Sequence, residues 1–171
     1  PGASMGGFQQ GDKLTAEQVL YCLMVRSGAD AANMIAKQVA GSEEAFVEKM
    51  NVRAKELGAT GTHFTNSHGL TDPDHYTTPY DLILHEAMKY PEFQKLASQK
   101  LYTADYVDAA GQPVQKKWFN TNYYLVGKAK LPEGFSVVAA KTGTTLAAGA
   151  CLAQLTASES GKQYYSVVLK S

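Results

Sequence analysis

The first third of the chain repeats apolar residues at the three- and four-residue spacing of amphipathic helices. Thr15 begins a capping box, which predicts a helix that is interrupted at Ser27-Gly28. A second helix is expected to end at Gly41, and Ser42 caps a third helix that ends near Gly58. The apolar positions of the three helices are Val19, Leu20, Leu23 and Met24; Ala32, Ile35, Ala36 and Val39; and Phe46, Met50, Ala54 and Leu57.

Residues 59–77 have no helical period and are rich in Gly, Asn, Asp, Pro and His. A segment of this length without regular structure is often functional in a compact domain, so we expect a long ordered loop. Thr78-Pro79 then predicts a helix with proline at its first position, and a short helix is expected after Pro91. The apolar face of the helix after Thr78 consists of Tyr80, Ile83, Leu84, Ala87 and Met88.

After residue 100 the pattern becomes typical of strands separated by turns. The predicted strands are Leu101–Val107, Val114–Phe119, Phe135–Thr142, Ala150–Ala157 and Gln163–Lys170, of which the last two form a hairpin. Helices followed by antiparallel strands indicate an α+β fold. We expect one domain over residues 1–171, with a mainly helical part at 1–99 and a mainly stranded part at 100–171.

Composition narrows the classes of function. A chain of 171 residues with 44% hydrophobic content can bury a core. The 16 basic and 16 acidic residues cancel, so no basic excess favours nucleic acid as a partner. No apolar run is long enough to cross a bilayer, and a signal for export would have to lie outside these residues. Cys22 and Cys151 match no metal or redox spacing, which favours two small buried side chains and leaves a disulfide open.

The triplet Lys141-Thr142-Gly143 is the first candidate for chemistry, because it ends a predicted strand. A lysine there can attract a substrate carboxylate, and a threonine hydroxyl adds a hydrogen bond. Glycine allows close approach, and the next backbone N–H can stabilise an oxyanion. A three-residue match alone is weak evidence, since an ordinary strand end with an exposed lysine has the same sequence.

A series of further motifs occurs in a recognisable order along the chain. They are Gly11–Thr15, Ser27-Gly28-Ala29, the stretches 62–70 (THFTNSHGL) and 75–82 (HYTTPYDL), Asn120-Thr121-Asn122, and Lys141-Thr142-Gly143. In this order and approximate spacing they resemble the serine D-alanyl-D-alanine carboxypeptidases, the low-molecular-mass penicillin-binding proteins. The resemblance covers essentially the whole chain, and the combination is far more specific than any one triplet.

The resemblance implies a transpeptidase fold like that of penicillin-binding proteins and β-lactamases, with a helical subdomain and an antiparallel sheet. In that family a Ser-x-x-Lys serine attacks a peptidoglycan stem peptide ending in D-Ala-D-Ala, and an acyl-enzyme forms. By position, Ser27 matches the serine that helps to shuttle the proton. Lys141, Thr142 and Gly143 match the third motif, and Thr144 would lend its N–H to the oxyanion hole. The family further implies β-lactams as ligands, no cofactor, and a place outside the cytoplasmic membrane, with a membrane-associated parent protein left open.

Two departures from the family pattern limit this interpretation. Ala29 stands where the family has asparagine, although Asp30 or a water could take over part of the amide's role. No serine of the chain has lysine three positions on, so the nucleophile is expected before Pro1. The chain therefore resembles either a central fragment trimmed at both ends or the product of a degenerate gene, and by itself it should form no acyl-enzyme. These departures motivate a non-catalytic cell-wall-binding or regulatory domain on the same scaffold as the alternative, and a β-lactamase is a third option.

Two other patterns invite a functional interpretation. Gly2-Ala3-Ser4-Met5-Gly6 fits the nucleophile elbow of hydrolases, but that elbow needs a preceding strand and a following helix that the surrounding sequence does not offer. His63, His68, His75 and His85 lack the spacing of a zinc helix. We therefore expect no metal site, and we expect the histidines of the long loop to hold it in shape through hydrogen bonds.

Overall fold

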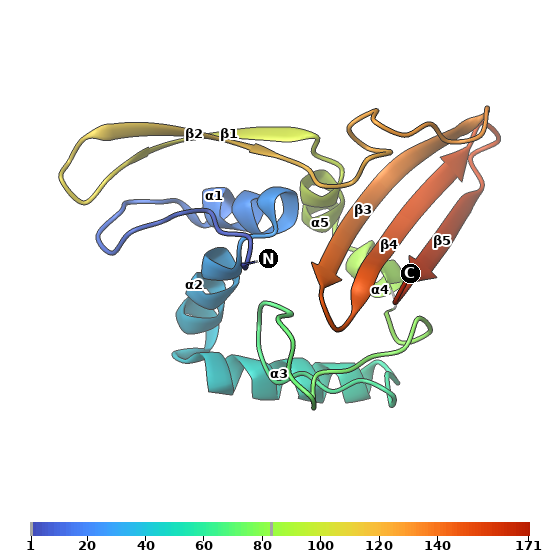
Figure 1. Ribbon diagram of the computed structural model, residues 1–171, viewed down its shortest axis with the longest axis horizontal. Coiled ribbons are helices and arrows are strands. Elements are labelled where there is room, and N and C mark those ends of the chain that lie inside the picture. Colours follow the sequence, from blue (N-terminus) through green and yellow to red (C-terminus); the bar gives the residue numbers. More distant parts are fainter. Residues whose placement is uncertain (1, 83) are drawn as a thin grey trace.

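The computed structural model describes residues 2–82 and 84–171, with the helices first along the chain and the strands after them (Figure 1). The helices are α1 (Ala16–Tyr21), a π-helical turn (Cys22–Arg26), α2 (Ala29–Ala40), α3 (Glu43–Glu56), α4 (Leu84–Ala87) and α5 (Pro91–Ala97). The strands are β1 (Leu101–Val107), β2 (Pro113–Phe119), β3 (Phe135–Thr145), β4 (Gly149–Ser158) and β5 (Gln163–Val168). The expected α+β class is confirmed.

Local chemistry places the ends of the first helices. The Thr15 hydroxyl accepts from the Gln18 N–H, and the Gln18 side chain accepts from the Thr15 N–H, so the predicted capping box is formed. The Ser42 side chain likewise accepts from the backbone of α3. Gly41 ends α2 with a φ of 83°, a conformation that glycine adopts without a steric cost.

The first predicted helix is not a uniform α-helix. It changes to a π-helical turn at Cys22, and this turn ends at Ser27 in the left-handed conformation, with a φ of 60°. Left-handed backbone is uncommon outside glycine, and both this conformation and π-helical turns are often found at functional sites. The interruption predicted at Ser27-Gly28 is confirmed, and it consists of a π-helical turn followed by a left-handed residue.

The helix predicted from Pro79 is wrong over its first turn. Residues 79–81 form a turn, α4 begins only at Leu84, and Tyr80 is 86% exposed instead of buried. The reason is a tertiary contact: the Asp81 carboxylate accepts from the Gly61 N–H and from the Thr62 hydroxyl. Met88 is buried as predicted, and Ile83 lies outside the described residues.

The strands form two separate antiparallel sheets, β1-β2 and β3-β4-β5 (Figure 1). All five predicted strands are present, with ends that move by up to three residues. β3 runs on beyond Thr142, so Lys141-Thr142-Gly143 lies inside the strand and pairs with residues 151–153 of β4. The triplet is therefore held by a sheet ladder on one side.

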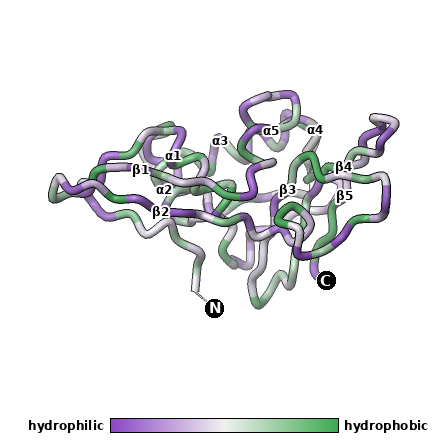
Figure 2. Tube along the Cα trace, turned by 90° about the horizontal axis from the view of Figure 1, so that it is seen from above, coloured by the Kyte–Doolittle hydropathy of each residue, from purple (hydrophilic) through white to green (hydrophobic). Residues whose placement is uncertain are grey.

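Two apolar clusters support these elements, and along the trace of Figure 2 apolar segments alternate with polar ones in both halves of the molecule. The first cluster packs α1, the π-helical turn and α2 against β1-β2, around the fully buried Val25. The second contains Met88, Ala97, Ala139 and Leu155, and it joins α5 to the face of β3 and β4. This second cluster sets the position of β3 relative to the helices.

Replacing Leu155 by alanine should destabilise the protein by about 3 kcal/mol, because the side chain is completely buried and its removal leaves a cavity. Urea denaturation followed by circular dichroism measures this loss. Leu146→Ala is the matched control, since Leu146 is 89% exposed and its replacement should change stability little. Equal effects of the two substitutions would contradict the assignment of the core.

Candidate active site

Ser27 and Lys141 meet although 114 residues separate them in the chain. The Lys141 Nζ donates to the Ser27 Oγ at 2.7 Å and to the Thr142 carbonyl oxygen at 2.6 Å. Burial disfavours the charged form and lowers the pKa of Lys141 from 10.5 to about 8. A lysine in this state can give up or take a proton near neutral pH.

The turn that carries Ser27 is tightly packed. A Cβ on Gly28 would lie 2.8 Å from the Cys22 Sγ and 2.9 Å from an Asp30 carboxylate oxygen, so only glycine fits there. A Cβ on Gly6 would lie 2.5 Å from the same sulfur. Ser27 therefore follows a π-helical turn that packs closely against the N-terminal loop.

Asp30 holds this arrangement together. Its carboxylate accepts from the backbone N–H groups of Gly6 at 2.8 Å, Gly7 at 2.8 Å, Phe8 at 3.3 Å and Ala31 at 2.9 Å. Both carboxylate oxygens are thus engaged with backbone, away from the lysine. The Asp30 carboxylate oxygens therefore already serve as acceptors for the backbone of the N-terminal loop and of α2.

A cavity of about 400 Å³ lies beside β3. Thr142 and Thr144 lie on its wall, and the Thr142 hydroxyl is in hydrogen-bond contact with the hydroxyl of Thr121. Gly143 has room around it, because a Cβ there would have no neighbour closer than 4.0 Å. Packing within the chain therefore does not require a glycine at this position.

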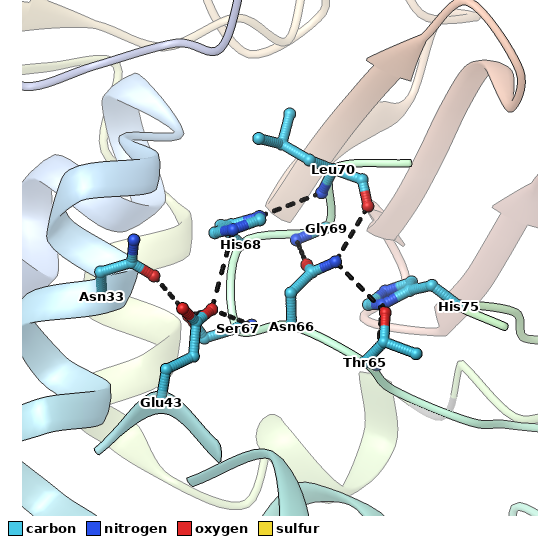
Figure 3. A network of polar contacts seen from close by, with 9 residues as sticks. All are labelled: Asn33, Glu43, Thr65, Asn66, Ser67, His68, Gly69, Leu70 and His75. Atoms are coloured by element: carbon cyan, nitrogen blue, oxygen red, sulfur yellow. Dashed lines mark hydrogen bonds and ion pairs between the residues drawn. The ribbon is translucent and has the colours of Figure 1, made fainter. Parts of the chain in front are cut away.

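The long loop over residues 59–77 is ordered by hydrogen bonds, as predicted (Figure 3). His63 and Tyr76 form an isolated antiparallel bridge across it. The Nδ1 of His75 accepts from the Thr65 N–H, and that of His68 accepts from the Leu70 N–H. Burial lowers the pKa of His75, which favours its neutral form as an acceptor.

Glu43 ties this loop to the helices, a contact that sequence reasoning missed (Figure 3). Its Oε1 accepts from the Ser67 N–H at 3.0 Å and lies 2.9 Å from the Ser67 Oγ, and these bonds lower the pKa of Glu43. His68 approaches the same oxygen at 3.7 Å, and Asn33 of α2 reaches the Ser67 hydroxyl. From the sequence, Glu43 is recognisable only as a carboxylate at the start of a helix. No spacing rule predicts its contact with Ser67.

The remaining candidates from the sequence play other parts. Cys22 and Cys151 are free thiols; Cys22 is buried as predicted, which raises its pKa to about 12, whereas Cys151 is only half-buried. Residues 2–6 form neither strand nor helix, so the nucleophile elbow is not built. Among residues 2–82 and 84–171 no cluster of metal-ligating side chains occurs, and no helix is long and apolar enough to span a bilayer.

The fold and the serine–lysine pair define the class of protein. The crystal structure of the Streptomyces K15 DD-transpeptidase superimposes with a TM-score of 0.88 and 35% sequence identity, over 99% of this chain and 65% of that chain. The family model of D-alanyl-D-alanine carboxypeptidases matches residues 2–171, and the chain belongs to this family.

Curated relatives agree with this assignment. The D-alanyl-D-alanine carboxypeptidase DacF of Bacillus subtilis is 37% identical over 157 residues, which cover 88% of this chain and 38% of the relative. A D-alanyl-D-alanine carboxypeptidase of Streptomyces sp. (strain K15) is 35% identical over 170 residues, which cover 94% of this chain and 56% of the relative. The chain thus spans about four to six tenths of the length of these relatives.

The lowered pKa of Lys141 predicts a pH-dependent stability. The folded protein loses this proton near pH 8 and the unfolded chain near pH 10.5, so the unfolded state binds more protons between these values. The Lys141 contribution to the free energy of unfolding should therefore rise with pH across this window and be constant below it. Urea denaturation of wild type and Lys141→Met from pH 7 to pH 10.5 isolates the contribution as the difference between their slopes, and parallel profiles would contradict it.

Removal of the Asp30 carboxylate should release the N-terminal loop. Asp30→Ala leaves several N–H groups without their acceptor, so we expect a loss of about 2 kcal/mol or more in the free energy of unfolding. Amide exchange at Gly6 and Gly7 should accelerate at the same time. Asp74→Ala, at an exposed carboxylate, is the control and should change neither measurement.

Proposed function

We propose that the chain is part of a D-alanyl-D-alanine carboxypeptidase domain that trims peptidoglycan stem peptides through a serine acyl-enzyme. The observation that carries this proposal is the 2.7 Å hydrogen bond between Lys141 and Ser27. It joins the two motifs that acyl transfer requires beside the nucleophile. The 171 residues form one partial domain of this kind, with the helices before residue 100 and the strands after it.

Each residue of the site has a role in this reaction. The nucleophilic serine oxygen bonds to the penultimate D-alanine carbonyl carbon, and its proton passes by way of the Ser27 hydroxyl to the leaving nitrogen as the peptide bond breaks. Lys141, with its lowered pKa, holds and polarises the Ser27 hydroxyl. Water then hydrolyses the ester and releases the shortened peptide.

The third motif receives the other end of the substrate. Thr142 and Thr144 line the cavity beside β3, where a terminal carboxylate can accept from a hydroxyl. Gly143 leaves open the space that a substrate backbone needs. The Thr144 N–H serves the oxyanion hole in this assignment.

The attacking serine lies outside these 171 residues in our proposal. No serine of the chain has lysine three positions on, and the chain spans only part of its relatives. We infer that the chain alone is inactive. We propose that the complete protein acts in peptidoglycan biosynthesis and cell-shape maintenance, is secreted to the cell envelope or periplasm, and is acylated by β-lactams.

A non-catalytic wall-binding domain on the same scaffold is the second candidate function. Ala29 favours it, because a methyl group cannot hydrogen-bond a substrate backbone. The full engagement of Asp30 with the N-terminal loop strengthens this argument, since no neighbouring carboxylate replaces the missing amide.

Fluorescent penicillin labelling distinguishes the two candidates. A chain extended upstream of Pro1 by the natural coding sequence should form a covalent adduct seen by intact-mass measurement, and Lys141→Met should slow this acylation by about two orders of magnitude or more. The 171-residue chain should form no adduct. A folded, extended chain that takes no label would exclude the enzyme and leave the binding domain.

A further inference from the structure

The hydroxyl groups of Thr121 and Thr142 are in direct contact, although they belong to different elements. Thr121 lies in the segment after β2, and Thr142 lies inside β3. Both line the cavity of about 400 Å³ beside the third motif. Thr121 thus reaches the site from a segment that supplies none of the residues assigned above.

The segment that carries Thr121 is held in place by two buried asparagine side chains. Its neighbours Asn120 and Asn122 are only 8% and 1% exposed. Asn120 donates its side-chain amide to the Gln99 carbonyl and accepts from the Asn122 N–H. Asn122 donates to Gln154 of β4 at 3.0 Å and accepts from the backbone N–H of residue 125. These bonds connect the segment to the same sheet that carries Thr142, so the positions of the two hydroxyls are fixed relative to each other.

Either hydroxyl can donate in this contact, and the choice of donor decides where the other proton points. A threonine hydroxyl has one proton to donate and can accept at the same time. When Thr121 donates to Thr142, the Thr142 proton is left to point into the cavity. Lys141 directs its own donors to the Ser27 hydroxyl and the Thr142 carbonyl, so it does not compete for the Thr142 hydroxyl.

We propose that Thr121 is a positioning residue, which turns the Thr142 hydroxyl towards the terminal carboxylate of a peptide ligand in this cavity. The inference rests on the proposed function, because it assumes a peptide with a free carboxylate. A chain of two hydroxyls that ends on an anion is polarised along its length, and each bond strengthens the other. Thr121 itself does not touch the ligand in this arrangement.

The test compares two ligands that differ only in charge, N-acetyl-D-Ala-D-Ala and its C-terminal amide, titrated into the 171-residue chain and followed by NMR. Wild type should bind the carboxylate form more tightly. Thr121→Val should weaken carboxylate binding about 3- to 10-fold and leave amide binding unchanged, because the variant keeps a β-branched shape and loses the hydroxyl. Thr121→Ser, which keeps the hydroxyl, should restore wild-type binding.

A double variant separates positioning from a general loss of structure. In Thr142→Val the oriented hydroxyl is gone, so adding Thr121→Val should change the affinity less than about 2-fold. Additive losses, or equal losses for both ligands, overturn the positioning role. Wild-type preference for the carboxylate with an unaffected Thr121→Val overturns this inference alone, whereas a wild type that does not distinguish the two ligands overturns the proposed function with it.

Discussion

The candidate site depends on one charged contact, the hydrogen bond from the partly buried Lys141 ammonium to the Ser27 hydroxyl. Removing a lysine from water is costly unless its protons find acceptors, and the Ser27 oxygen and the Thr142 carbonyl supply two. Because the two partners come from the helical half and the sheet, every element that fixes the relative position of these halves also fixes the distance between the two side chains. The cluster around Leu155, which joins α5 to β3 and β4, is such an element.

Ser27 can meet this lysine because its backbone is held in an uncommon conformation. The π-helical turn ends there with a positive φ, and Gly6 and Gly28 allow the chain to pass close to the Cys22 sulfur. Asp30 then stabilises this arrangement, because its carboxylate accepts hydrogen bonds from N–H groups of the N-terminal loop. Strain at Ser27 is thus balanced by tight packing and charged hydrogen bonds beneath it.

Much of the fold was predictable because its signals are local. The caps at Thr15 and Ser42, and the alternation from residue 100 onwards, depend on residues a few positions apart. The prediction failed after Thr78, where a proline at a first helical position suggested a helix. The Asp81 carboxylate instead binds back to Gly61 and Thr62, and a contact over about twenty residues has no period that a sequence reveals.

The sequence alone determined the order of elements, the family motifs, and the candidate residues Ser27 and Lys141-Thr142-Gly143, because these depend on residue type and short spacing. Only the tertiary structure decided what surrounds them. It showed that Asp30 is engaged elsewhere, that Glu43 holds the loop at Ser67, and that Thr121 touches Thr142. The physical reason is that hydrogen bonds and desolvation act over a few ångströms in space, between residues that the chain keeps 20 to more than 100 positions apart.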